Sequence, residues 1–243
     1  MVSNKSLVDL TDYYGRIELV GDDCIDLLDR LSTNDVSTLR HPGQGLSSVL
    51  TTNKGRIIDL LGLFLFEERF LLVSSSNSTH KVSEWIEFYT IIEDVEVKDV
   101  SNTTFHFRSI GNHKLQKKLS LDQASFGETV SAKVGDILCS VIKSEMGDLS
   151  AIDIIGHMAD KHHVSHELEQ DSEMMNLEEF EALRINLGVP AYGKELSEDY
   201  NPIEAGLLNH ISFNKGCYIG QEVVARLNAY DKVQRKLVKL SWI

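Results

Sequence analysis

The segment "NKGCYIGQE" at positions 214–222 contains the residue types best suited to chemistry. Cys217 lies between Gly216 and Gly220, which accept backbone conformations closed to other residues and so permit a sharp turn. The next residues, "QEVVARL", have helical character, so the thiol is expected just ahead of a helix N-terminus and two residues from Lys215. Positive potential from both sources favours the thiolate form. The segment alone leaves two interpretations open: a reactive thiolate, and a small core residue in a structural loop, which the usual burial of free cysteine favours.

The other candidate ligands and thiols are more simply explained as structural or solvated residues. Three cysteines far apart in sequence argue against a disulfide framework, fit a reducing compartment, and fall short of a four-ligand metal site. Cys24 belongs to an apolar helical stripe and Cys139 to an apolar strand, so both are expected in the core. His162 and His166 have the helical spacing of a metal-binding pair, but a solvated helix face is the plainer interpretation.

The composition limits the class of protein. At 243 residues the chain is long enough for one large domain or two closely packed ones. A formal net charge of -13 repels the phosphate backbone, so no direct binding of nucleic acid is expected. Because no apolar run approaches the length of a membrane span and the N-terminus lacks a secretory pattern, we expect a soluble, cytoplasmic protein without a membrane partner.

The elements that must position the motif follow from hydrophobic periodicity. Three successive apolar runs predict an antiparallel meander at 46–52, 56–66 and 69–76. The other expected strands lie at 13–20, 94–100, 103–110, 135–142 and 149–156, and the other helices at 23–31, 82–89 and 113–119. The stretch 157–176 has no clear pattern.

The clearest helix occupies 177–187. Asn176 is a good N-cap, and Glu179 stands three residues later, as in a capping box. Gly188 is placed to close the C-terminus and Pro190 prevents continuation.

Taken with its surroundings, the motif resembles that of the YgfZ-type folate-binding proteins, relatives of the glycine-cleavage T-protein, an aminomethyltransferase. The resemblance also covers "IELVGDDCIDLLDRLSTNDVSTLRHPGQG" and "LTTNKGRIIDLLGLFLF" in the N-terminal half and is weakest from about 100 to 175. The residues that carry the motif are Lys215, Gly216, Cys217, Tyr218, Gly220, Gln221 and Glu222.

The resemblance implies an α+β fold. Two interleaved α/β subdomains with antiparallel sheets are expected over 1–230, around a central opening that binds tetrahydrofolate. The family's C-terminal β-barrel is absent or truncated here, because 231–243 reaches only its first strand, "QRKLVKLSWI". A lone strand cannot satisfy its own hydrogen bonds.

The resemblance also implies a set of folate contacts, with departures. The T-protein's catalytic aspartate falls on Leu60. Asp59, one residue earlier, is the candidate folate contact in its place, but only if the register slips, because it is otherwise expected on the opposite face of the strand. Asn186 stands where T-proteins carry a glutamate that holds the pterin ring. Arg184 and Arg226 could meet the folate's carboxylates, with structural ion pairs as the alternative, favoured for Arg184.

The function implied is that of a tetrahydrofolate-binding accessory protein. It would support the assembly or repair of iron–sulfur enzymes, including enzymes that modify tRNA, with these enzymes or cluster-assembly proteins as partners. Cys217 would act as a redox-active or ligand-exchanging thiolate, and Lys215 would favour its charge. Two alternatives remain open: a folate-dependent aminomethyltransferase, and a binding scaffold with no role for folate.

Overall fold

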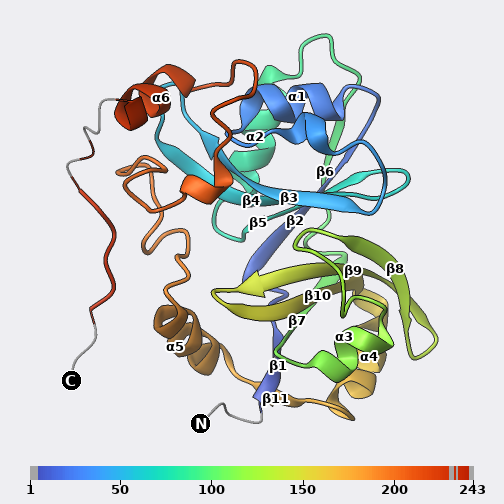
Figure 1. Cartoon of the computed structure of the whole chain (residues 1–243). Coiled ribbons are helices and arrows are strands. Elements are labelled where there is room, and N and C mark those ends of the chain that lie inside the picture. Colours follow the sequence, from blue (N-terminus) through green and yellow to red (C-terminus); the bar gives the residue numbers. More distant parts are fainter. Residues whose placement is uncertain (1–4, 230–232, 234, 241–243) are drawn as a thin grey trace.

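The chain folds into two β-sheets, each covered by helices (Figure 1). The computed structural model describes residues 5–229, 233 and 235–240. In spatial order the first sheet contains β11 (Glu173–Met175), β1 (Lys5–Asp9), β7 (Thr104–Ile110), β10 (Leu149–His157), β9 (Ile137–Met146) and β8 (Thr129–Val134). The second contains β3 (Gln44–Thr51), β4 (Ile57–Leu65), β5 (Phe70–Ser75), β2 (Tyr14–Val20) and β6 (Glu96–Asp99). All neighbours are antiparallel except β1 and β11.

The helices lie outside the sheets (Figure 1). The α-helices are α1 (Cys24–Leu31), α2 (Thr79–Tyr89), α3 (His113–Lys118), α4 (Lys161–Glu169), α5 (Leu177–Leu187) and α6 (Gln221–Ala229). The short 3-10 helices are η1 (Val36–Thr38), η2 (Met158–Asp160) and η3 (Leu208–His210). None of the described helices is long and apolar enough to cross a membrane.

The chain visits the two sheets alternately. It starts in the six-stranded sheet with β1, builds the five-stranded sheet with β2 to β6, and returns to complete the first sheet. After α5 it crosses back to the second sheet, beside which η3 and α6 lie (Figure 1). The expected α+β class, with two interleaved subdomains built on antiparallel sheets, is therefore confirmed.

Arg16, on β2, forms hydrogen bonds that join the two segments where the chain passes between the sheets. Its guanidinium is fully buried. It donates from Nε to Thr104 Oγ1 at 2.8 Å and from its terminal nitrogens to the carbonyls of Thr11 at 2.9 Å and Ser101 at 2.5 Å. Burial lowers the pKa of Arg16, because no carboxylate contacts it closely enough to offset the loss of water.

Separate apolar cores stabilise the two layers. One lies between the five-stranded sheet and α1 and α2, and it contains Cys24, Leu27 and Leu31 on the predicted helical stripe. The other lies between the six-stranded sheet and α3 and α4, and it contains Cys139. Both cysteines are buried as predicted, and burial raises the pKa of each thiol to about 11.

Several local predictions are confirmed. The meander is present as β3, β4 and β5. At the start of α5, Asn176 and Glu179 form both hydrogen bonds of the capping box, each 2.9 Å long. Gly188 closes the helix in the left-handed region, with a φ of 71°.

Other features differ from the sequence prediction. The short strands β1, β8 and β11 were not expected, because their pairing partners are remote in sequence and their own patterns are weak. Asp23 precedes α1 but makes no side-chain cap; its carboxylate accepts from the N–H of Asp94 instead. Of the strand expected within 231–243, residues 233 and 235–240 have no strand structure, and 231–232, 234 and 241–243 lie outside the described residues.

Candidate functional site

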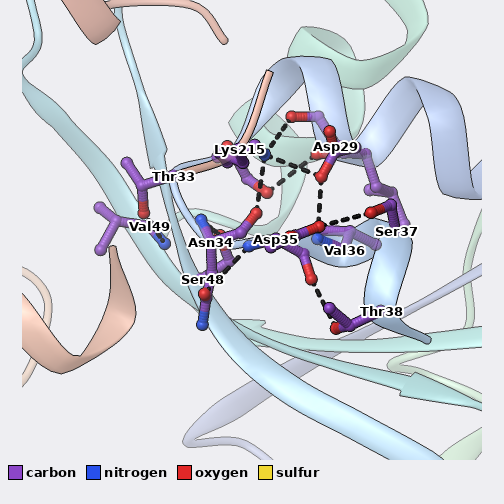
Figure 2. A network of polar contacts seen from close by, with 12 residues as sticks. Asp29, Thr33, Asn34, Asp35, Val36, Ser37, Thr38, Ser48, Val49 and Lys215 are labelled. Carbon is purple, nitrogen blue, oxygen red and sulfur yellow. Dashed lines mark hydrogen bonds and ion pairs between the residues drawn. The ribbon is translucent and has the colours of Figure 1, made fainter. Parts of the chain in front are cut away.

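The segment 210–220 lies against α1 and the β3–β4 hairpin, and Lys215 is its first anchor (Figure 2). The Lys215 ammonium donates to the carbonyl oxygens of Asp29 at 2.5 Å, Ser32 at 3.0 Å and Asn34 at 2.7 Å. It also lies 2.9 Å from the carboxylate of Asp29. These carbonyls belong to the last turn of α1 and the residues after it, which lack helical partners, so the lysine acts as a C-terminal cap supplied from far along the chain.

The second anchor follows immediately. The carbonyl of Ile219 accepts from Thr51 Oγ1 at 2.6 Å, and its N–H donates to the carbonyl of Arg30 at 3.1 Å. Gly220 has a φ of 85°, and a Cβ there would lie 2.5 Å from the carbonyl oxygen of Thr52. The glycine is therefore required both for the turn and for the close approach to the hairpin.

Between the two anchors the chain is exposed. Cys217 is exposed to solvent, whereas Tyr218 is buried, with the Lys215 ammonium 5.5 Å from its ring centroid. A Cβ added to Gly216 would meet no atom within 4 Å. The alternative of a buried, structural Cys217 is therefore wrong, and the thiol is presented on a short stretch fixed at both ends.

The charge of Lys215 is directed to α1. Burial lowers the pKa of the Lys215 ammonium, and the carboxylate of Asp29 opposes that shift. Its side chain is only 1% exposed, and its donors are taken up by the contacts with Asp29, Ser32 and Asn34. The stabilisation of the Cys217 thiolate by Lys215 stays a prediction, since the hydrogen-bond and ion-pair partners of the ammonium all lie in α1 and the residues that follow it.

The acceptor side of this anchor is itself held in place (Figure 2). The Asp29 carboxylate also accepts from the N–H of Val36 at 2.9 Å, and the N–H of Asn34 donates to Ser48 Oγ at 2.8 Å. Sequence reasoning missed Asp29 and Asn34, because nothing in their local pattern points to a lysine about 180 residues away.

A bulge in β4 decides where Leu60 and Asp59 point. Thr51 pairs with Ile57 and Leu50 pairs with Asp59, so Ile58 is an extra residue. As a result Ile57 and Leu60 both pack on the apolar cluster formed with 192–207, although they are three residues apart. Asp59 points to the other side, as expected from its neighbouring position.

Asp59 is not available to a ligand. It is 0% exposed, and its carboxylate accepts from the N–H of Ser75 at 2.7 Å and from the hydroxyl of Ser78 at 2.5 Å. Burial raises the pKa of Asp59, and these hydrogen bonds counteract the rise. The expectation that Asp59 contacts folate therefore conflicts with its geometry: the carboxylate joins β4 to the β5–α2 turn.

Leu60 forms part of an apolar wall instead. Leu60, Tyr192 and Tyr200 are all half-buried and pack against the same buried cluster. The buried members of the same cluster are Val49, Ile57, Leu196, Ala205 and Leu207. This wall carries no carboxylate at the position where the resemblance places the catalytic one.

Arg184 belongs to an ion-pair cluster. Its guanidinium is 3% exposed and makes two hydrogen bonds to Glu181, at 2.9 and 2.8 Å, and one to Glu195 at 2.9 Å. The Glu181 carboxylate also accepts from the hydroxyl of Tyr13 at 2.6 Å. Arg184 therefore fits the structural ion-pair alternative, and its predicted contact with folate conflicts with this arrangement because its donors are engaged.

Asn186 and Arg226 are accessible. Both are exposed, on α5 and α6 respectively. Arg226 lines a shallow hollow of about 160 Å³ with Glu222, Val223 and Leu227, smaller than the usual 300–1,000 Å³ of a ligand pocket. Gln221 begins α6 at partial exposure. The folate contacts of Asn186 and Arg226 stay predictions.

The histidine pair on α4 gives no metal site. His162 is exposed and His166 is exposed beside it on the helix. Across the residues that the structure describes, no group of three or more His, Cys, Asp or Glu side chains is arranged to hold a metal ion.

Comparisons with known proteins agree with this architecture. A family model described as the GCVT N-terminal domain matches residues 2–215. The Arabidopsis thaliana protein named "Putative transferase At1g60990, chloroplastic" is 31% identical, over 97% of this chain and 56% of its own. An aminomethyltransferase of Bacillus cytotoxicus is 30% identical, over 95% of this chain and 66% of its own.

A solved structure shares the fold. The glycine cleavage system aminomethyltransferase T from Bartonella henselae superposes with a TM-score of 0.80 at 18% identity, covering 92% of this chain and 63% of that one. The chain thus spans between about half and two thirds of the length of these relatives. The motif residues from Gly216 onward lie just beyond the matched family region.

Proposed function

Because this chain belongs to the GCVT N-terminal domain family, we propose that it binds tetrahydrofolate or a one-carbon derivative and supports the assembly or repair of iron–sulfur enzymes. Enzymes that modify tRNA are among the proposed clients. The observation that carries the proposal is the exposed Cys217, held between the anchors at Lys215 and Ile219 in a complete YgfZ-type motif. Its location in the cytoplasm stays a prediction, since the Arabidopsis relative is named as chloroplastic.

The thiol is suited to a partner macromolecule. A sulfur enclosed in a pocket would act on a small ligand, but Cys217 projects from a surface stretch that a client protein can approach. The anchors reduce the freedom of that stretch, so less conformational entropy is lost when a partner binds. In this proposal Cys217 exchanges as a ligand or changes its redox state, and Lys215 acts as the residue that positions it.

The apolar wall offers a fit for the pterin ring of the folate. Leu60, Tyr192 and Tyr200 present half-buried apolar and aromatic surface of the kind that packs on a flat ring. Asn186 offers both a donor and an acceptor, and Arg226 offers an exposed cation for a carboxylate. Tetrahydrofolate, when bound, supplies a carrier for a one-carbon unit. Asp59 and Arg184 do not contribute to this site, since both are engaged within the protein.

A second candidate is a folate-dependent aminomethyltransferase. The Bacillus cytotoxicus relative bears that name, and it is nearly as similar to this chain as the Arabidopsis protein. Against it stands Leu60, because an aliphatic side chain cannot stabilise the positive charge that develops as an aminomethyl group is transferred. A scaffold with no role for folate remains the third candidate.

Calorimetry and complementation separate the three candidates. The accessory protein should release heat on binding tetrahydrofolate, and Cys217→Ala should abolish support of an iron–sulfur tRNA-modifying enzyme while folate binding and melting temperature stay unchanged. Asn214→Ala, at an exposed neighbour, serves as the matched control. If the protein binds folate and Cys217→Ala still fully supports the iron–sulfur enzyme, the thiol has no part in the function. Folate-dependent release of ammonia from an aminomethyl donor would establish the transferase. Absence of folate binding would favour the scaffold.

A further inference from the structure

A serine and a histidine remote in sequence meet at the outer edge of the five-stranded sheet. Ser47 Oγ on β3 lies 2.5 Å from Nδ1 of His210 on η3. Neither residue belongs to the motif or to the wall around Leu60. A hydroxyl within hydrogen-bond distance of an imidazole nitrogen is the arrangement from which a nucleophilic serine is made.

The histidine is held rigidly by its backbone. Its carbonyl accepts from Thr33 Oγ1 at 2.6 Å, and its N–H donates to the carbonyl of Leu207 at 3.0 Å. Burial lowers the pKa of the His210 imidazole, which keeps the ring neutral, and therefore able to accept a proton, near pH 7.

The edge position of β3 supplies a backbone N–H donor for an oxyanion. The N–H of Val49 donates to Thr33 Oγ1 at 3.0 Å, and the carbonyl of Val49 accepts from the N–H of Thr33 at 3.0 Å. Both groups of Val49 therefore face the outer edge of the sheet, away from β4. Because backbone groups alternate along a strand, the N–H and carbonyl of Ser47 face the same edge. The carbonyl confirms this by accepting from Asn34 Nδ2 at 2.9 Å. The Ser47 N–H is thus directed away from β4, where an oxyanion can reach it.

Apolar residues lie near the pair in the chain and on the neighbouring strand, and the pair itself is partly open to solvent. Ser47 and His210 are both partly exposed. Leu208, two residues before the histidine, is 46% exposed, and Phe213, three residues after it, is 43% exposed. Gly62 faces Ser47 on β4 without a side chain, and the Phe64 ring lies over it, because a Cβ at Gly62 would be 2.5 Å from that ring. An apolar acyl group suits this place.

We propose that Ser47 and His210 form a nucleophile–base pair that hydrolyses carboxylic esters with small apolar acyl groups. The Ser47 oxygen forms a bond to the carbonyl carbon while its proton passes to His210 Nδ1, and the N–H of Ser47 donates to the oxyanion. The ester C–O bond then breaks, and the leaving alcohol takes the proton from His210. Water, deprotonated by His210, releases the carboxylic acid and restores the hydroxyl. The net charge of -13 favours neutral or cationic esters over anionic acyl phosphates.

The test uses the full chain, p-nitrophenyl acetate as substrate and a fluorophosphonate as covalent probe. Ester cleavage should exceed the buffer rate. The Ser47 oxygen should displace fluoride from the phosphorus of the probe, so that peptide mass spectrometry finds the mass of the probe less hydrogen fluoride at Ser47. Ser47→Ala should abolish the adduct, and both Ser47→Ala and His210→Gln should lower the cleavage rate about 100-fold.

Matched controls identify background reactions of surface groups. Ser131→Ala and His41→Ala alter an exposed serine and an exposed histidine and should leave rate and labelling unchanged. Unchanged melting temperatures show that the variants fold. Three results would each overturn the proposal. They are an unchanged cleavage rate in folded Ser47→Ala, labelling at a residue other than Ser47, and a wild-type rate no higher than that of buffer. No folate enters this assay, so its result is independent of the function proposed above.

Discussion

The Lys215 ammonium lies 2.9 Å from a carboxylate oxygen of Asp29, 186 residues earlier in the chain. This contact ties the motif segment to the end of α1. Without the ammonium, the three carbonyl oxygens around it would lose the hydrogen bonds that it donates. The lysine of the motif is therefore first a structural residue. Its effect on the neighbouring thiol is indirect, through the position that it gives to the stretch around Cys217.

Replacing this lysine tests the anchor. Lys215→Met keeps most of the length of the side chain but removes the donor from the three carbonyls and leaves the Asp29 carboxylate with the N–H of Val36 alone. We expect the free energy of unfolding to fall by about 3 kcal/mol, measured by urea denaturation. The exposed neighbour Asn214→Met should change it by less than about 0.5 kcal/mol. A Lys215→Met protein as stable as the wild type would show that the ammonium contributes nothing net to the fold.

The three thiols should differ sharply in reactivity. The pKa values of Cys24 and Cys139 are raised to about 11 by burial, so both are protonated and shielded at pH 8, whereas Cys217 is exposed. Titration with Ellman's reagent should detect one thiol per native chain and three in denaturant. Cys217→Ser should abolish the native reaction. A fast second thiol in that variant would show that the core opens around one of the buried cysteines.

The sequence predicted features that depend on neighbouring residues. The stripe of Cys24, Leu27 and Leu31 identified α1, and Asn176 with Glu179 identified the start of α5, because helix contacts and caps span three or four residues. Local spacing carries this information without knowledge of the fold.

What the sequence did not predict depends on contacts between distant segments. The strand β11 exists only because β1, more than 160 residues earlier, offers it an edge. The ion pairing of Arg184 was the favoured interpretation of its sequence, but its partner Glu195 lies 11 residues further on and meets it only once the turn after α5 has formed. The face on which Asp59 lies was predicted, yet its burial beneath Ser75 and Ser78 required the position of α2.

The Glu181–Arg184 pair should make stability depend on pH in acid. Hydrogen bonds from Arg184, Lys194 and Tyr13 lower the pKa of Glu181 from its ordinary 4.5 to about 2. A carboxylate with a depressed pKa stabilises the fold above its unfolded pKa and loses that effect as the pH falls through its folded pKa. Between pH 5 and 2 we expect the loss of about 2 kcal/mol from this group.

Glu181→Gln isolates this contribution from other acidic groups. The variant should be less stable than the wild type at pH 6, and the difference in the free energy of unfolding should shrink toward zero near pH 2. Glu178→Gln, at an exposed position on the same helix, should show no such trend. A difference that stays constant between pH 6 and 2 would mean that the ion pair does not shift the titration of Glu181.

Arg16 offers the strongest test of how the two sheets are joined. Its guanidinium is fully buried, and its donors satisfy the carbonyls of Thr11 and Ser101 and both oxygens of Thr104. Arg16→Met would bury these acceptors without partners, and we expect a loss of about 4 kcal/mol in the free energy of unfolding. Arg16→Lys keeps the charge but cannot reproduce the planar fork of five N–H donors, so it should recover less than half of that loss. The exposed Arg40→Met is the control.

Because the cation joins β2 to the entry of β7, the Arg16→Met protein should also unfold in two steps in calorimetry, one for each sheet. A single transition with an unchanged midpoint would contradict both expectations, since it would show that the apolar contacts between the sheets are sufficient to hold them together.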